Sequence, residues 1–121
     1  MKFVRARNTA RGLELGNRIG VADTWWLRLR GLGGRDGLLP GEGLLLRPCK
    51  AVHMRGMKFP LDVAFLDRGN RVVASYRWLK PGSRTHWHSG ARAALELPAG
   101  TLSATGTEEG DVVEYLEEIA P

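Results

Sequence analysis

The chain has 121 residues, of which 43% are hydrophobic and 26% are charged, and its formal net charge is +5. These values exclude disordered and fibrous proteins, and they predict a single domain over residues 1–121. Glycine is frequent, with 16 residues, and this favours turns and short strands over long helices. The one cysteine, Cys49, excludes an internal disulfide bond and indicates a reducing compartment.

The pattern of apolar residues also bears on location and partners. The N-terminal residues lack the apolar segment of a signal peptide, and no apolar run is long enough to cross a bilayer. We therefore expect a cytoplasmic protein without a transmembrane segment. Basic residues are spread along the chain without a block of like charge, so the net charge does not favour nucleic acid as the partner.

The first half of the chain is predicted to hold three strands and one helix. Alternating or continuous apolar residues place the strands at 2–6, 13–15 and 44–46. The helix is predicted over 23–32, because its apolar residues share one helical face and Asp23 or Thr24 supplies an N-cap. It is the main helix expected in the protein.

The second half of the chain is predicted to be mostly strand. A hairpin joins strands at 61–67 and 71–78, because Gly69 and Asn70 between them tolerate the positive φ of a tight turn. Further strands are predicted at 92–97 and 111–118, and the connection 98–106 is expected to hold one short helical turn. The fold class is therefore α+β, a small β-rich sheet or barrel with the helix 23–32 packed against it.

Two acidic residues lie inside apolar strands. Asp62 shares a strand face with Ala64 and Leu66, and Glu96 stands between two leucines. A buried carboxylate is costly unless it is paired or hydrogen-bonded, and we expect its partners among the nearby His53, Arg55 and Lys58. One interpretation is structural, with both carboxylates hydrogen-bonded to the backbone of glycine-rich loops.

The other interpretation is a functional pocket. In it His53, Arg55, Asp62 and Glu96 converge on a small ligand, with Trp87 at the rim. Arg55 would contact an anionic or hydroxylated group, and the two carboxylates would accept hydrogen bonds. Histidine changes its charge near neutral pH, so His53 would make binding sensitive to pH.

The same stretch carries a family resemblance. Residues 52–66 (VHMRGMKFPLDVAFL) resemble the signature of the family called domain of unknown function 192, DUF192. Residues 28–32 (RLRGL) resemble its upstream element, and residues 95–100 (LELPAG), followed by Gly110 and Asp111, resemble its C-terminal element. The resemblance covers roughly residues 8–117. It implies a single β-rich α+β domain and no established activity.

These observations predict a small-ligand-binding or accessory domain, whose partner is a small molecule or another protein. The first alternative is a hydrolase or transferase that uses Asp62 or Glu96 as general base. The second is an RNA-binding or anionic-surface-binding domain, because basic and aromatic residues alternate in the loop 77–88.

Two sharper possibilities rest on cysteine and histidine. The pairs Cys49/His53 and His86/His88 are ligand types that zinc accepts, but they are far apart in the sequence, and we predict no metal and no cofactor. Cys49 with His53 would also suit nucleophilic catalysis, although a lone cysteine is more often a small buried apolar residue.

Overall fold

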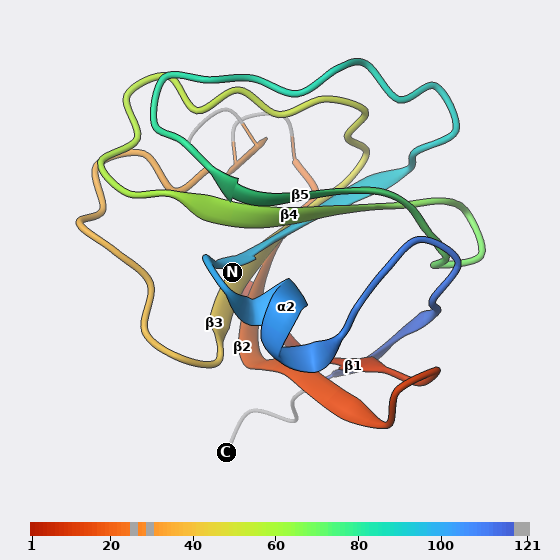
Figure 1. Cartoon of the computed structure of the whole chain (residues 1–121). Helices are drawn as coiled ribbons and strands as arrows, with labels where there is room; N and C mark the ends of the chain where they lie inside the picture. Colours follow the sequence, from red (N-terminus) through yellow and green to blue (C-terminus); the bar gives the residue numbers. More distant parts are fainter. Residues whose placement is uncertain (25–26, 29–30, 118–121) are drawn as a thin grey trace.

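The fold of the chain is a strongly curved β-sheet (Figure 1). The computed structural model describes residues 1–24, 27–28 and 31–117, and within them seven strands form one sheet in the order β5-β4-β6-β3-β2-β1-β7. The strands are β1 (Lys2–Asn8), β2 (Leu13–Ala22), β3 (Glu42–Leu46), β4 (Leu61–Leu66), β5 (Val72–Leu79), β6 (Ala93–Pro98) and β7 (Val113–Glu117). The pair β2–β3 is parallel, and the other neighbouring strands are antiparallel.

The two edges of the sheet approach each other. The backbone N–H of Val72 donates to Asp111 O at 2.8 Å, and that of Val113 donates to Asn70 O at 2.9 Å. Because these bonds link the start of β5 to the start of β7, the sheet curls into a half-barrel whose edges meet. Paired edges also leave fewer free backbone groups for association with other chains.

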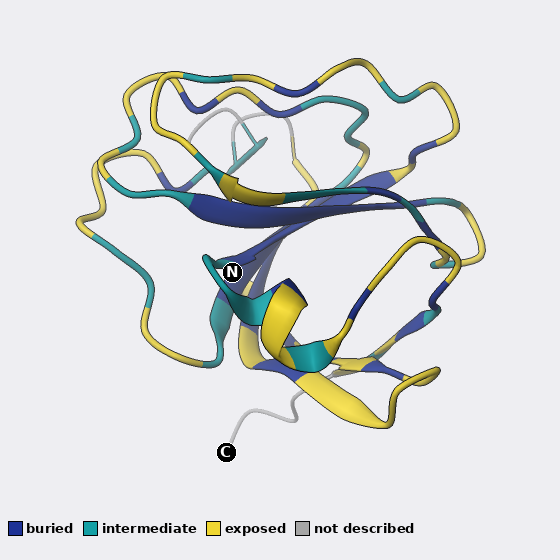
Figure 2. Ribbon diagram, viewed as in Figure 1, coloured by how far each residue is buried: buried dark blue, intermediate teal, exposed yellow. Residues whose placement is uncertain are grey.

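Apolar residues cover both faces of the sheet, and β4 shows this most clearly. All six of its residues are buried (Figure 2). Ala64 and Leu66 belong to the inner core of the half-barrel, whereas Leu61, Val63 and Phe65 belong to an outer core. Strand side chains alternate between faces, so a strand buried on both sides reads as a continuous apolar run.

Two long loops cover the outer core. Met54 N donates to Ser83 O at 2.7 Å and Thr85 N donates to Val52 O at 2.9 Å, so the segments 50–58 and 80–90 run side by side above β4 and β5 (Figure 1). Val52 and Met54 point inward and are buried. The neighbouring residue His53 remains exposed.

Helix α2 (Thr101–Thr105) is held in place by Asp62 of β4. Gly100, its N-cap residue, has φ 98° and provides no capping side chain. Instead, Asp62 Oδ2 accepts hydrogen bonds from the N–H groups of Gly100 at 3.1 Å and Leu102 at 2.8 Å, and its Oδ1 accepts one from Trp78 N at 2.9 Å. One carboxylate therefore ties β4, β5 and α2 together.

The strands predicted from the sequence are present, with β2 longer than expected, and the short helical turn at 98–106 is α2. Four residues of the predicted helix 23–32, namely 25–26 and 29–30, lie outside the described residues. In the remainder, Arg28 N donates to Thr24 O at 3.0 Å, and Leu27 N donates to Thr24 Oγ1 at 3.4 Å. Thr24 thus occupies the predicted N-cap position.

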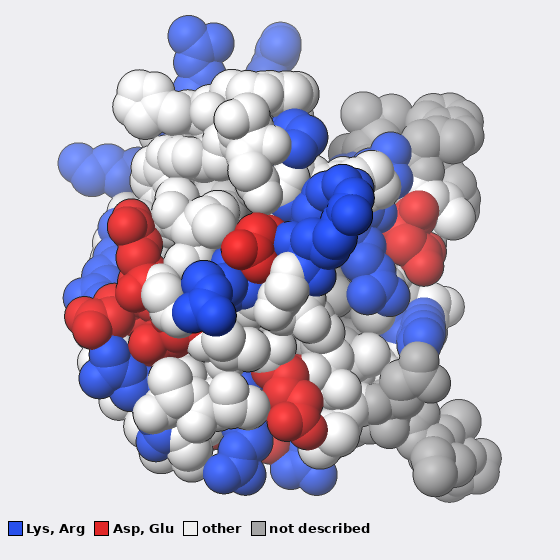
Figure 3. Space-filling model, turned by 90° about the vertical axis from the view of Figure 1, so that its right-hand side faces the viewer, with Lys and Arg blue, Asp and Glu red and all other residues white. Residues whose placement is uncertain are grey.

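Two global properties follow from the described residues. No helix within them has the length and apolar character needed to cross a membrane. Basic and acidic side chains are interspersed on the face that carries the β4–β5 turn, and basic ones gather near its centre (Figure 3).

Replacing Asp62 by alanine is expected to destabilise the protein. The change leaves three backbone N–H groups without their acceptor, at about 1–3 kcal/mol for each buried group, so we expect a loss of about 3 kcal/mol or more in the free energy of unfolding. Urea denaturation measures it. As a matched control, Asp36→Ala removes a carboxylate that is 92% exposed, and it should change stability by less than about 0.5 kcal/mol. Equal losses in the two variants would contradict the proposed role of Asp62.

Candidate functional site

A pocket of about 520 Å³ lies between the outer face of the sheet and the covering loops. Glu96 of β6 reaches it from the sheet, Arg28 belongs to the helical turn after Thr24, and the other charged and aromatic residues around it come from loops. Among the described residues, the charged and aromatic side chains that line it are those of Arg28, Lys50, His53, Arg55, Trp87 and Glu96. Four of the five residues predicted as a site therefore share this pocket: His53, Arg55, Trp87 and Glu96.

Glu96 is the buried polar group of this pocket. It stands opposite Val63 of β4 and Leu44 of β3, both in the outer core, and only 6% of its surface is exposed. Among the described residues its carboxyl group has no hydrogen-bond or ion-pair partner. Burial raises the pKa of Glu96 from 4.5 to about 7. The carboxyl group is therefore available both to donate and to accept a proton near neutral pH.

Asp62 does not belong to the pocket, so the predicted convergence of both carboxylates is wrong. Asp62 pairs with Leu97 of the inner core, whereas Glu96 pairs with Val63 of the outer core, and the two carboxylates thus face opposite sides of the sheet. Asp62 is fully buried, and both of its oxygens accept hydrogen bonds from the backbone. The structural interpretation holds for Asp62, and this geometry removes it as a general base.

The expected pairing of the carboxylates with nearby cations is also wrong within the described residues. Lys58 forms its ion pair with Asp36, at 3.2 Å on the surface. Lys50 donates to the carbonyl oxygens of Ser89 at 2.6 Å and Ala91 at 2.7 Å, so its ammonium group holds the covering loop in place. The pocket thus contains several cationic groups, yet none of those in the described part of the chain pairs with its buried carboxyl group.

His53, Arg55 and Trp87 lie at the opening of the pocket, on the two covering loops. His53 pairs with Arg84 in an isolated bridge between the loops, and both His53 and Arg55 are exposed. Trp87 is 71% exposed, so it does not anchor its loop by burial. Large exposed aromatic side chains at a cavity commonly mark contact sites.

Cys49 also lines the pocket, but its environment does not favour a thiolate. Its Sγ donates to Ala51 O at 3.2 Å. Burial raises the pKa of the Cys49 thiol, and the nearby Glu96 carboxyl group raises it further. A reactive cysteine needs the opposite shift, so nucleophilic catalysis through Cys49 and His53 is not supported.

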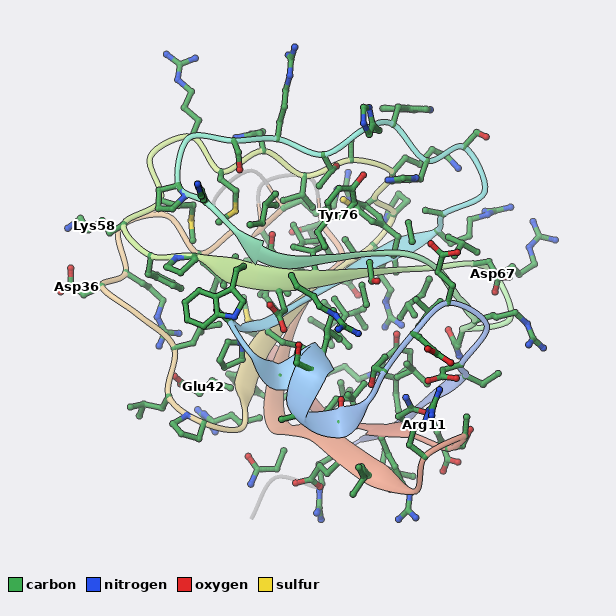
Figure 4. All side chains as sticks on the ribbon, viewed as in Figure 1. Arg11, Asp36, Glu42, Lys58, Asp67 and Tyr76 are labelled. Carbon is green, nitrogen blue, oxygen red and sulfur yellow. The ribbon has the colours of Figure 1, made fainter. Side chains whose placement is uncertain are left out.

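The histidines considered from the sequence as zinc ligands, together with Cys49, do not form a metal site within the described residues. His88 is half-buried and shares a 2.7 Å hydrogen bond with Tyr76 Oη, which points from β5 into the layer beneath the loops (Figure 4). His88 also packs on Phe65, with 4.7 Å between ring centroids, whereas His86 is exposed. Within residues 1–24, 27–28 and 31–117, no three His, Cys, Asp or Glu side chains come together as metal ligands would.

Sequence reasoning missed two of the cationic residues, Arg28 and Lys50. Arg28 donates to Arg47 O at 3.3 Å, across a sequence separation that no local pattern reveals. The one sequence signal for Arg28 is its place in the RLRGL element, which marks the family and does not by itself indicate a pocket. Lys50 directly follows Cys49 and had no distinguishing pattern.

The raised pKa of Glu96 predicts a pH dependence of stability. The unfolded chain releases the Glu96 proton near pH 4.5, whereas the folded chain holds it to about pH 7. The stability contributed by protonated Glu96 is therefore complete below pH 4.5, and about 3 kcal/mol of it is lost as the pH rises to about 7. Glu96→Gln cannot ionise, so its stability relative to the wild type should increase over this interval.

Urea denaturation at about pH 4.5 and about pH 8 measures this difference. Glu109→Gln, at an exposed glutamate, is the control and should show no such change with pH. If the difference between Glu96→Gln and the wild type is the same at both pH values, the raised pKa of Glu96 is refuted.

Comparisons with known proteins agree with this fold. The DUF192 family model, described as "Uncharacterized ACR", matches residues 6–115. A UPF0127 protein of Thermococcus sibiricus is 30% identical over 115 residues, which cover 89% of this chain and 72% of that protein. A crystal structure of a protein of unknown function from Novosphingobium aromaticivorans is similar, with a TM-score of 0.79, 25% identity and coverage of 93% of this chain and 83% of that chain.

A second solved structure has the same fold. It is described as that of a "putative transcription regulator" from Sinorhizobium meliloti, with a TM-score of 0.78, 24% identity and coverage of 94% of this chain and 92% of that chain. The three sequence elements noted above and the match over residues 6–115 lead to the same assignment. The chain belongs to the DUF192 family.

Proposed function

We propose that the pocket around Glu96 binds a small polar molecule, with Glu96 as its deepest contact. The observation that carries this proposal is the Glu96 carboxyl group, which is 6% exposed, faces the pocket and has no partner among the described residues. Leaving such a group unpaired costs free energy, and a ligand that supplies a hydroxyl or amino group recovers it. Binding sites are commonly concave and hold a few converging polar groups of this kind.

The rest of the pocket suits a ligand that has a hydrogen-bond donor at one end and an anionic or hydroxylated group at the other. A hydrogen-bond donor on the ligand would meet Glu96, and an anionic or hydroxylated part would meet Arg55 and His53 near the opening. Trp87 would cover the ligand from the rim. The cationic groups attract an anion, while the single carboxyl group selects for a donor beside it.

The alternative of RNA or anionic-surface binding through the loop 77–88 rests on two exposed tryptophans. Trp78 is 60% exposed and has φ 52° at the end of β5, so hairpin packing does not account for its side chain. Trp87, however, lines the pocket, and this favours a small ligand over an extended nucleic acid as its partner.

A thermal-shift screen with sugars, nucleosides, amines and amino acids tests the small-ligand proposal. A bound compound at a hundredfold excess over its Kd stabilises the native state by about 2.7 kcal/mol and raises the Tm. The rise should be strongly reduced in Glu96→Leu and in Arg55→Gln. It should persist in Asp36→Asn, which removes an exposed surface charge that does not line the pocket. A compound that stabilises all four proteins equally would contradict the proposal.

The same carboxyl group would suit acid–base catalysis, because the pKa of Glu96, about 7, matches that of a general base working near neutral pH. If the pocket is catalytic, turnover of a p-nitrophenyl ester, phosphate or glycoside should show a pH–rate inflection near 7. Glu96→Gln should lower kcat by about 100-fold or more. Turnover that is unaffected by Glu96→Gln would rule out this candidate.

A further inference from the structure

A second cavity, of about 450 Å³, lies on the inner side of the sheet. It is bordered by Ala93, which pairs with Leu66 at the end of β4, whereas α2 follows Pro98 at the other end of the β4–β6 pair. The cavity therefore lies at the end of the half-barrel that α2 does not occupy. The open ends of barrels are common ligand sites.

Three arginines from separate parts of the chain border this cavity. Arg47 follows β3, Arg68 lies in the β4–β5 turn and Arg92 precedes β6. None of their side chains has an ion pair or hydrogen bond within the part of the chain that the structure describes. Other arginines do form ion pairs, as Arg5 does with Glu14 at 2.6 Å and Arg11 does with Asp111 at 3.0 Å. Three like charges around one cavity repel each other, and an anion bound between them reduces this repulsion.

Asp23 and Asp67 also border this cavity, but within the described residues neither forms an ion pair with the three arginines. Asp67 Oδ1 accepts hydrogen bonds from the N–H groups of Gly69 and Arg71, both at 2.9 Å, and so it is used by the turn. Asp23 is exposed and makes no ion pair with the arginines. The basic side chains gather on the face that carries Asp67, which is labelled at the β4–β5 turn (Figures 3 and 4).

Tyr115 of β7 adds an independent observation. Its ring packs against the inner core and borders the same cavity, and its hydroxyl group is the buried side-chain polar atom without a partner among the described residues. Burial raises the pKa of Tyr115, so the hydroxyl group keeps its proton and can donate it in a hydrogen bond. The three guanidinium groups and the Tyr115 hydroxyl group are all hydrogen-bond donors, so a ligand at this cavity would have to supply acceptors.

We propose that this cavity binds the phosphate group of a small molecule, held by Arg47, Arg68 and Arg92 with Tyr115 as a fourth donor. A phosphate group carries two negative charges and enough oxygens to accept from several guanidinium groups at once. A carboxylate has only two oxygens and one charge. This site is separate from the pocket at Glu96, because Leu45 and Arg47 face it, whereas Leu44 and Leu46 belong to the outer core.

Titration of the full chain with inorganic phosphate, followed by calorimetry at low ionic strength, tests the proposal. Arg68→Gln and Arg92→Gln replace exposed side chains, and each should weaken phosphate binding by about tenfold. Arg84→Gln removes the same charge from the covering loop on the other face and should leave the affinity unchanged. Acetate should bind the wild type at least about tenfold more weakly than phosphate.

Tyr115→Phe provides a second measurement that does not depend on charge. Without phosphate the variant should melt at the same temperature as the wild type or higher, because an unpaired buried hydroxyl group is removed. In the titration it should weaken phosphate binding several-fold. The proposal is overturned if wild-type protein does not bind phosphate, if Arg84→Gln weakens binding as much as Arg68→Gln and Arg92→Gln, or if Tyr115→Phe binds phosphate as well as the wild type.

Discussion

The arrangement of this molecule depends on the buried carboxylate of Asp62. Its two oxygens accept three backbone hydrogen bonds, one from β5 and two from the first turn of α2. Because leaving buried donors and acceptors unpaired costs free energy, this one side chain fixes how β4, β5 and α2 meet. The pairing of Asp62 with Leu97 belongs to the same β4–β6 register that directs Glu96 to the opposite face.

Asp62 and Glu96 are both buried carboxyl groups, but their surroundings give them different hydrogen bonding and different roles. Asp62 is saturated with backbone donors, and its role is structural. Glu96 is nearly as buried but has no partner within the described residues, and burial raises its pKa to about 7. A buried acid without compensation reduces stability, and such costs are often retained at functional sites. This contrast is the reason for placing the proposed ligand at Glu96.

The sheet separates two polar cavities of different chemistry. The outer one combines a buried carboxyl group with cationic loop residues, and the inner one combines three arginines with the buried hydroxyl group of Tyr115. Alternation along β3 and the residue after it directs Leu44 and Leu46 outward and Leu45 and Arg47 inward, so adjacent residues serve different cavities. Pro48 borders both cavities, which makes the end of β3 the point where the two sites are closest in sequence.

Local patterns in the sequence determined the strands, the 68–70 hairpin turn and the short helical turn before Gly106, because these follow from side-chain period and turn chemistry. They also predicted that His53, Arg55 and Glu96, as polar groups among apolar ones, and Trp87, as an aromatic residue in a polar loop, belong to one pocket, and these four residues line the same pocket. Only the tertiary structure decided that Asp62 faces the inner core and that Arg47, Arg68 and Arg92 surround one cavity. Strand register and the closing of the sheet set these contacts. Both bring together residues that are far apart in the chain, so a local sequence pattern does not predict them.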